Sequence, residues 1–444
     1  MERISMKWIK PKEGNNTFCT APWSHTYLSP TSERRLCCAS TEPAQSFEQY
    51  IDTAEGTNEY NPMSLPTWWN SDHLKSVRLK MLRGEELEEC QVCNDKLLHT
   101  TVYRDHFNNM FKDIIKQAYE RTNEDGSTDM PVVSFDYRFT NLCNFMCRMC
   151  GSNLSSSWET EERKYITDFE TRRPWASKEV KKATAEFVAN MAEPEFQSAI
   201  DNKQIREVYW VGGEPLMYHQ HWKFMKLIVD SGQAGNVYAR YNTNLSRLVF
   251  NKIKLFDDIL SKFRAWEVCA SIDGTHEIGE YIRSGLVWKK FEENFEHGMK
   301  FQNGRNKRLN LDFTITTPGL FEIENMFELS LKHDVTIITK QTFAFSPEVF
   351  MSVKVIPHRI LDRLVTEILG RIEPRATDKQ QGMIDILKQF ITQKNYHEQF
   401  QNYQEGTKEG KQFIDQMESR RKNPITMREI MWKDKELGEW YDSI

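Results

Sequence analysis

Three cysteines stand close together in the sequence NLCNFMCRMCG, at Cys143, Cys147 and Cys150. With nine cysteines in 444 residues, this C-x3-C-x2-C spacing is expected by chance only about 0.004 times. Three thiolates in one loop cannot form two disulfides, but they can converge on one soft metal centre. A structural zinc ion normally takes four protein ligands, whereas a cubane cluster has four irons and can leave one without a cysteine. The loop therefore favours an iron-sulfur cluster over zinc.

The length of 444 residues allows two or three domains, and the formal net charge is only −5. No block of like charges interrupts the mixture of basic and acidic residues, so nucleic acid is not an indicated partner. No apolar run approaches the ~18 residues of a membrane span, and residues 1–14 lack the apolar core of a secretory signal. We expect a cytoplasmic protein without a membrane partner. Its cysteines should stay reduced, and all but Cys269 stand in close-set groups, which favours metal ligation.

The cysteine loop follows a strand-like run, and this arrangement resembles the signature of the radical S-adenosylmethionine (SAM) enzymes. The resemblance implies that Cys143, Cys147 and Cys150 hold a [4Fe-4S] cluster whose fourth iron binds the amino and carboxylate groups of SAM. The family usually has an aromatic residue before the last cysteine, where this chain has Met149. Methionine is apolar and polarizable, so Met149 can still pack against an adenine ring.

Strand-like and helix-like runs alternate from residue 131 onward. The expected strands cover residues 131–141, 207–211, 237–241, 266–272, 309–316 and 335–339, with helices that include 221–231 and 287–302. Such alternation implies parallel βαβ units. Together with the resemblance, it predicts an α/β fold whose core, residues 131–345, is a partial (β/α)6 TIM-like barrel. Barrels of this kind place their chemistry at the carboxyl ends of the strands.

Polar motifs stand at those strand ends. The resemblance implies that they form the SAM pocket, together with Met149; the residues are Gly212, Gly213, Glu214, Pro215, Asn242, Thr243, Asn244, Ser271, Asp273 and Arg283. In the family, GGEP contacts the SAM amino group, polar strand ends bond the ribose, and an arginine such as Arg283 can meet the carboxylate. Without that context, GGEP is equally a tight turn and an isolated arginine is usually a surface ion pair.

A second group of cysteines precedes the core. Residues 18–40 alternate around a Ser-Pro-Thr-Ser turn and predict a β-hairpin with Cys19 on one strand and Cys37 and Cys38 on the other. A helix within 68–89, ending near Gly84, is followed by the C-x2-C pair Cys90 and Cys93. These cysteines form a plausible four-thiolate site, with either Cys37 or Cys38 as a ligand because adjacent strand residues face opposite sides.

This region resembles the SPASM or twitch auxiliary-cluster modules of radical SAM enzymes. The matching residues are Cys19, Pro22, Trp23, Cys37, Trp69, Ser71, Leu74, Lys75, Arg78, Cys90 and Cys93. The resemblance implies a second [4Fe-4S] cluster in residues 1–121, although such modules usually follow the radical domain. Four thiolates would saturate a cubane, which suggests an electron-transfer role, while a zinc-ribbon-like site is the alternative. The polar segment 122–130 is the expected boundary.

Residues 346–444 are expected to form a helical C-terminal extension, with an amphipathic helix from Ile360 to Leu369. The resemblance implies reductive cleavage of SAM to a 5′-deoxyadenosyl radical, which abstracts a hydrogen atom from the substrate. An electron donor such as flavodoxin or ferredoxin would then be a partner. The leading hypothesis is oxidation or cross-linking of a peptide or protein side chain. A small-molecule substrate (a sugar, nucleotide or cyclitol) and a non-catalytic iron-sulfur or zinc protein are the alternatives.

Overall fold

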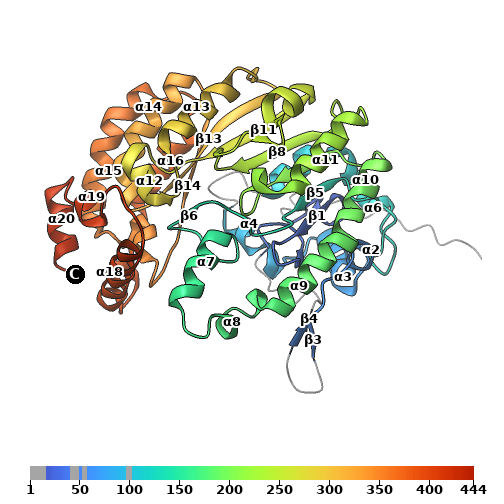
Figure 1. Ribbon diagram of the computed structural model, residues 1–444, viewed down its shortest axis with the longest axis horizontal. Coiled ribbons are helices and arrows are strands. Elements are labelled where there is room, and N and C mark those ends of the chain that lie inside the picture. Colours follow the sequence, from blue (N-terminus) through green and yellow to red (C-terminus); the bar gives the residue numbers. More distant parts are fainter. Residues whose placement is uncertain (1–16, 41–49, 53–57, 97–102) are drawn as a thin grey trace, which may run out of the picture. The chain divides into compact units, whose positions relative to one another are not determined.

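The computed structural model describes residues 17–40, 50–52, 58–96 and 103–444 (Figure 1). The expectation about a secretory signal at residues 1–14 lies outside these residues. The chain forms two compact units. The first unit holds residues 1–141, 166–212 and 220–239, and the second holds residues 142–165, 213–219 and 240–444. This division into two units does not test the domain boundaries expected from the sequence, which remain predictions.

In the first unit the strands lie in the hydrogen-bonded order β2-β1-β5-β7-β8. Their bounds are β1 (His25–Leu28), β2 (Arg34–Arg35), β5 (Ser134–Tyr137), β7 (Glu207–Trp210) and β8 (Tyr238–Thr243). Strand β5 is parallel to both β7 and β1, while β2 is antiparallel to β1. The core of this unit is an aromatic cluster in which Phe196 contacts Phe135, Tyr137 and Trp210.

Strand β8 continues into the second unit, where the order is β8-β11-β13-β14. These strands are β11 (Ala265–Ser271), β13 (Lys307–Ile315) and β14 (Ile337–Gln341), and both β11 and β14 are parallel to β13. One face of β13 carries Leu309, Leu311 and Phe313, which are fully buried. The six strands predicted from the sequence are therefore present and adjacent in chain order. This confirms the α/β class and the strand order of a partial (β/α)6 barrel.

Helices connect the strands of the barrel core. In the first unit they are α8 (Phe169–Arg172), α9 (Lys178–Phe187), α10 (Glu193–Asp201) and α11 (His219–Asp230), with a π-helical stretch at Val188–Ala192. In the second unit they are α7 (Ser156–Tyr165), α12 (His276–Ile282), α13 (Trp288–Met299) and α14 (Ile323–His333). The helices expected at 221–231 and 287–302 correspond to α11 and α13.

The predicted N-terminal hairpin is present as β1 and β2, but its cysteines lie off the strands. Cys19 precedes a short helix, α1 (Ala21–Ser24), because Pro22 favours the first turn of a helix. Cys37 and Cys38 follow β2 in a turn closed by a hydrogen bond from the Ser40 amide to the Cys37 carbonyl. The hairpin also joins the main sheet, because β1 pairs with β5. This pairing was not predicted.

The helix after the hairpin is fixed at its two ends and by one buried arginine. Helix α3 (Asp72–Arg83) begins at Ser71, whose Oγ accepts the Leu74 amide, and ends at Gly84 with φ 77°. Arg78 is fully buried and donates to the carbonyl oxygens of Pro22 at 2.9 Å and of Trp69 at 2.6 Å. The Arg78 guanidinium thus fixes the turn that carries Cys19. Helix α4 (Gln91–Lys96) then carries Cys93.

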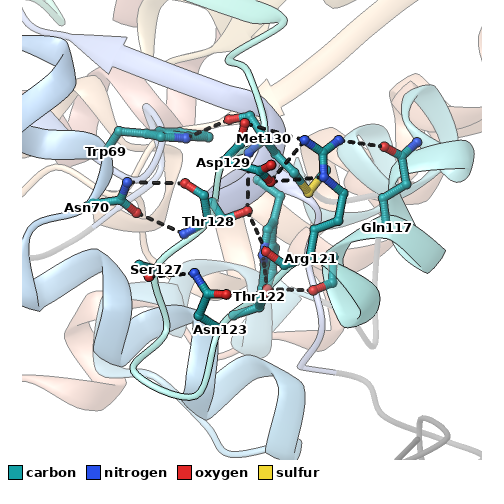
Figure 2. Close-up of polar contacts among 12 residues, drawn as sticks. Trp69, Asn70, Gln117, Arg121, Thr122, Asn123, Ser127, Thr128, Asp129 and Met130 are labelled. Atoms are coloured by element: carbon teal, nitrogen blue, oxygen red, sulfur yellow. Dashed lines mark hydrogen bonds and ion pairs between the residues drawn. The ribbon is translucent and has the colours of Figure 1, made fainter. Parts of the chain in front are cut away.

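The segment 122–130, predicted to be a boundary linker, is firmly bonded within the first unit (Figure 2). The side chain of Asn70 both donates to the carbonyl of Thr128 at 3.1 Å and accepts its amide at 3.0 Å, and Trp69 Nε1 donates to the Met130 carbonyl at 2.8 Å. Helices α5 (Tyr103–Met110) and α6 (Lys112–Glu120) precede it. The segment is therefore tied by hydrogen bonds to Trp69 and Asn70 of the first unit.

The C-terminal extension is helical, as expected. Its helices are α15 (His358–Ile372), α16 (Gln381–Thr392), α17 (Tyr396–Gln399), α18 (Tyr403–Arg420), α19 (Met427–Met431) and α20 (Lys435–Asp442). Helix α16 contacts β14, and α15 contacts α14. In the described part of the chain, no helix is both long and apolar enough to cross a membrane.

Candidate functional site

The cysteine loop of the second unit is held by the start of helix α7. Ser157 Oγ donates to the Cys143 carbonyl at 2.8 Å, and Trp158 Nε1 donates to the Cys147 carbonyl at 2.8 Å. The Ser155 hydroxyl donates to the Phe145 carbonyl at 2.6 Å. These bonds satisfy backbone carbonyls that an irregular loop would otherwise leave without partners. The loop is therefore preformed.

The three thiols of the loop lie close to one another. Burial raises the pKa of Cys143 and of Cys147 to about 12, and the neighbouring cysteines add to the rise at both positions. Burial also raises the pKa of Cys150. The Arg283 guanidinium opposes these shifts at all three thiols, with Nη1 lying 3.8 Å from the Cys147 sulfur. The three predicted ligands therefore all lie within the electrostatic influence of Arg283, which contacts Cys147.

Backbone pairing places Arg283 beside the cysteine loop. Strand β12 (Arg283–Ser284) is antiparallel to β6 (Met146–Cys147), with Arg283 opposite Cys147. Gly285 has φ 108°, and a Cβ there would lie 2.8 Å from the Asn144 carbonyl oxygen, so this close approach requires glycine.

The Arg283 side chain is only 12% exposed, and its Nε lies 2.5 Å from Asp273 Oδ2. The ion pair is buried rather than on the surface. Burial raises the pKa of Asp273 despite the arginine. Asp273 Oδ1 also accepts the Thr314 amide at 2.9 Å, so the carboxylate is fixed from two sides and orients the guanidinium.

The GGEP turn forms a second part of the site. Gly212 and Gly213 have φ 81° and 53°, a conformation that glycine adopts most easily. The Glu214 amide donates to the Leu142 carbonyl at 2.8 Å, which ties the turn to the cysteine loop. Pro215 is buried at the start of a 3-10 turn. The backbone therefore forms the tight turn, and the role of GGEP in ligand binding stays a prediction.

The Glu214 carboxylate is 1% exposed and accepts three hydrogen bonds. The donors are Thr243 Oγ1 at 2.7 Å, the Asn244 amide at 2.7 Å and the Leu216 amide at 3.0 Å. Burial nevertheless raises the pKa of Glu214 to about 7. A cationic ligand beside this carboxylate would favour its ionised form.

The remaining predicted residues divide between two places. Thr243 and Asn244 contact Glu214, whereas Asn242 points away and donates to Asp312 Oδ2 at 2.5 Å. Ser271 is half-buried and stands opposite Asp312 in the sheet register. Met149 is half-buried in the loop. Asn242 and Ser271 therefore lie with Asp312 on one face of the sheet, which we call the polar face. They take no part in the hydrogen bonds of Glu214.

Sequence reasoning missed the centre of that polar face. Asp312 is 6% exposed, and its Oδ1 lies 2.6 Å from Lys340 Nζ on the neighbouring strand β14. Arg240 and Glu267 stand half-exposed at alternate positions of β8 and β11. The signal was present in the alternation of Asn310, Asp312 and Thr314 with apolar residues along β13.

The C-terminal extension also contacts the cysteine loop. Arg421 donates to the Met146 carbonyl at 3.0 Å and pairs with both carboxylate oxygens of Glu161, at 2.9 and 2.6 Å. Arg148, which is fully buried, donates to Asn423 Oδ1 at 2.6 Å. Residues that follow α18, near the C-terminal end of the sequence, therefore hold the cysteine loop in place.

In the first unit, Cys19, Cys37, Cys90 and Cys93 lie near one another. Cys90 influences the thiols of Cys19 and Cys37, and Cys93 influences Cys19. Burial raises the pKa of Cys19 to about 12 and that of Cys90 to about 11, although Arg104 donates a hydrogen bond to Cys90. Arg104 was also missed by sequence reasoning.

Cys38 turns elsewhere, because it shares a hydrogen bond with the Tyr103 hydroxyl. The Cys37 thiol is affected by both Cys19 and Cys90, so Cys37 stays the predicted ligand of the two.

The donor chemistry of both groups can be tested against the implied clusters. Among the described residues, no three His, Cys, Asp or Glu side chains are placed to hold a single metal ion. The loop of the second unit offers three soft ligands, and the first unit offers four. Both donor sets therefore fit iron-sulfur clusters.

No protein-family model matches the sequence, and no curated protein matches it. Among solved structures, the chain is similar to Streptococcus suis SuiB bound to S-adenosylmethionine, with 12% identity and a TM-score of 0.37, covering 69% of this chain and 67% of that chain. It is also similar to anSMEcpe with bound AdoMet, with 18% identity and a TM-score of 0.29, covering 40% of this chain and 51% of that chain. At these levels the likeness concerns the fold alone.

Proposed function

We propose that this chain is a radical SAM enzyme. The observation that carries the proposal is that three half-buried thiols lie in one unit with Glu214, Asp273 and Arg283. Structural bracing by a metal does not require a buried carboxylate and a buried guanidinium beside the thiols. Their presence supports binding of a ligand that carries both an amino and a carboxylate group.

When bound, a reduced [4Fe-4S] cluster would supply the electron that cleaves SAM to a 5′-deoxyadenosyl radical, which takes a hydrogen atom from the substrate. The residues of the chain hold and orient the ligand. Glu214 would accept hydrogen bonds from the SAM amino group, and Arg283, fixed by Asp273, would face its carboxylate. The preformed turn at Gly213 supports close approach of the ligand to the backbone.

The proposed substrate is a peptide or protein side chain that is oxidised or cross-linked. The polar face around Asp312, Lys340 and Arg240 offers charges of both signs, which suit backbone amides and polar side chains. A sugar, nucleotide or cyclitol would also suit such a face and is the second candidate. A non-catalytic iron-sulfur or zinc protein is the third, and the Glu214 and Arg283 arrangement argues against it.

The four thiols of the first unit are proposed to hold the auxiliary [4Fe-4S] cluster. Four cysteines would saturate the cluster, so it could accept the electron that an oxidised substrate radical must lose. A flavodoxin or ferredoxin is the proposed electron donor. An auxiliary cluster favours oxidation or bond formation over simple isomerisation.

The test is anaerobic reconstitution with iron and sulfide, followed by SAM, dithionite and detection of 5′-deoxyadenosine. We expect the parent to form 5′-deoxyadenosine and a variant with Cys143, Cys147 and Cys150 changed to Ala to form none. That variant should keep about four irons per chain at the other site. Cys269→Ala is the matched control, because Cys269 is the one cysteine of the sequence that stands outside both close-set groups. SAM cleavage at the parental rate by the triple variant would rule the proposal out.

A further inference from the structure

A cavity of about 320 Å³ lies directly beyond the last strand of the sheet, where the C-terminal extension begins. Its walls include the aromatic rings of Phe343, Phe345, Tyr396 and Phe400 and the side chains of Lys354 and Lys394. Phe343 follows the end of β14 at Gln341 by two residues, and Tyr396 belongs to α17. The cavity therefore lies in the second unit and takes no part in the site described above.

Aromatic surface is unusually exposed at this cavity. Phe343 is 54%, Phe345 56% and Phe400 40% exposed, which places them among the most exposed large apolar residues of the described chain. The Phe345 ring stacks on Tyr396 with centroids 5.5 Å apart and meets Phe400 edge-on at 5.8 Å. Exposed apolar side chains that gather around a hollow mark a binding surface rather than scattered surface residues.

A buried cation stands in the wall of the same cavity. Lys354 is 2% exposed, and within the described residues its Nζ has one hydrogen bond, a long one of 3.4 Å to the Gln393 carbonyl. Glu398, whose charge acts on Lys354, already accepts the Asn395 amide at 2.8 Å and contacts His358 at 3.1 Å. Burial lowers the pKa of Lys354 to about 8, and Glu398 only partly offsets this shift. An ammonium group in this setting would gain from an anionic partner.

Charge complementarity identifies the kind of occupant. The residues that line the cavity include two lysines and no carboxylate. We propose that the cavity binds a segment of the peptide substrate in which an aromatic or aliphatic side chain stands next to a carboxylate. The apolar side chain would pack among the exposed phenylalanines while the carboxylate pairs with Lys354. This proposal rests on the peptide-modifying function proposed above and names the recognition site for that peptide.

The position of the cavity supports a peptide over an unrelated ligand. Strands β11, β13 and β14 are parallel, so their carboxyl ends lie at one edge of the sheet. That edge carries Asp273 after β11 and Phe343 after β14. A peptide anchored beyond β14 would have its neighbouring residues at the edge where the SAM site is proposed. An extended chain spans about 3.3 Å per residue, so a few residues suffice to run along this edge.

Two dipeptide probes test the proposal by isothermal titration calorimetry on the reconstituted full chain. The probes are N-acetyl-Phe-Glu-amide and N-acetyl-Phe-Gln-amide, which differ only in the charge. We expect the glutamate probe to bind one site at least tenfold more tightly than the glutamine probe. Lys354→Met should remove this difference while leaving the glutamine probe unaffected. Lys388→Met is the matched control, because Lys388 is exposed and pairs with Glu373 outside the cavity.

A second variant protects the test against misfolding. Phe345 is more than half exposed, so Phe345→Ala should fold normally and weaken both probes about tenfold. Equal binding of the two probes by the parent would overturn the proposal, as would 3-phenylpropionate binding as tightly as the glutamate probe, which would indicate a free aromatic acid. If the parent is a dimer and Phe345→Ala is a monomer, the proposal is overturned, because the cavity then binds a second copy of the chain. Formation of 5′-deoxyadenosine without substrate is measured in parallel, so failure of this site and failure of the radical SAM function are distinguishable.

Discussion

At the scale of single residues, buried ionisable side chains control how this protein responds to pH. His221 on α11 is fully buried between Trp210 and Trp222, whose rings meet it edge-on at 4.9 Å each. Burial lowers the pKa of His221 to about 3, because the apolar surroundings oppose the charged form. The unfolded chain, with an ordinary histidine pKa of about 6.5, therefore binds more protons than the folded chain between these values.

Stability should consequently fall as the pH falls from about 6.5 towards 3. We expect His221→Phe to remove this pH dependence. Between pH 7 and pH 5, the free energy of unfolding of the parent should therefore fall by about 2 kcal/mol more than that of the variant. Denaturant titrations at both pH values measure the difference. His397→Phe, on an exposed histidine, is the control. An identical loss of stability in parent and His221→Phe would contradict the assignment.

At the scale of elements, the C-terminal extension is the brace of the cysteine loop. Arg421 follows α18 and is 2% exposed at its side chain, with Glu161 of α7 as its ion-pair partner and the Trp158 ring 4.3 Å from its guanidinium. Tyr281, at the end of α12, donates to Glu418 at 2.6 Å. Three helices thus meet on the short loop that carries the proposed cluster ligands.

Arg421→Ala should loosen this loop, because it leaves Glu161 largely buried without its partner. Breaking a buried pair in this way typically costs about 3 to 5 kcal/mol. We expect faster loss of iron to a chelator and an altered electron paramagnetic resonance signal on addition of SAM. Arg428→Ala is the control, since Arg428 pairs with Asp442 on the surface of the same extension. Parental iron release and an unchanged signal in Arg421→Ala would show that the brace does not position the loop.

At the scale of the whole molecule, each unit has its own group of thiols. The second unit offers three cysteines and the first offers four, with Cys37 near Cys19 and Cys90. The number of iron and zinc atoms bound per chain therefore shows which metal each group of thiols holds.

Iron and sulfide analysis after anaerobic reconstitution should give about eight of each per chain if both groups hold [4Fe-4S] clusters. Cys37→Ser should reduce both values to about four, whereas Cys38→Ser should leave them unchanged. About four irons with one zinc in the parent would mean that the first unit is structural. In that outcome the auxiliary redox role would be lost.

The sequence by itself determined the features that depend on neighbouring residues. Alternation of apolar and polar residues predicted all six core strands, and the spacing of Cys143, Cys147 and Cys150 placed the three thiols in one loop. Gly84 ends α3 as predicted because a left-handed residue there needs only local geometry. Such features are set within a few residues, so they can be read without knowledge of the fold.

Only the tertiary structure decided which distant residues meet. It paired Arg283 with Asp273 beside Cys147, joined Asp312 to Lys340, and added β1 to the sheet through β5. Arg148 and Asn423 are 275 residues apart in sequence and still share a hydrogen bond. A buried charge has no preferred partner in its own segment, and packing of the elements around it determines which oppositely charged group is near enough to compensate its lost hydration.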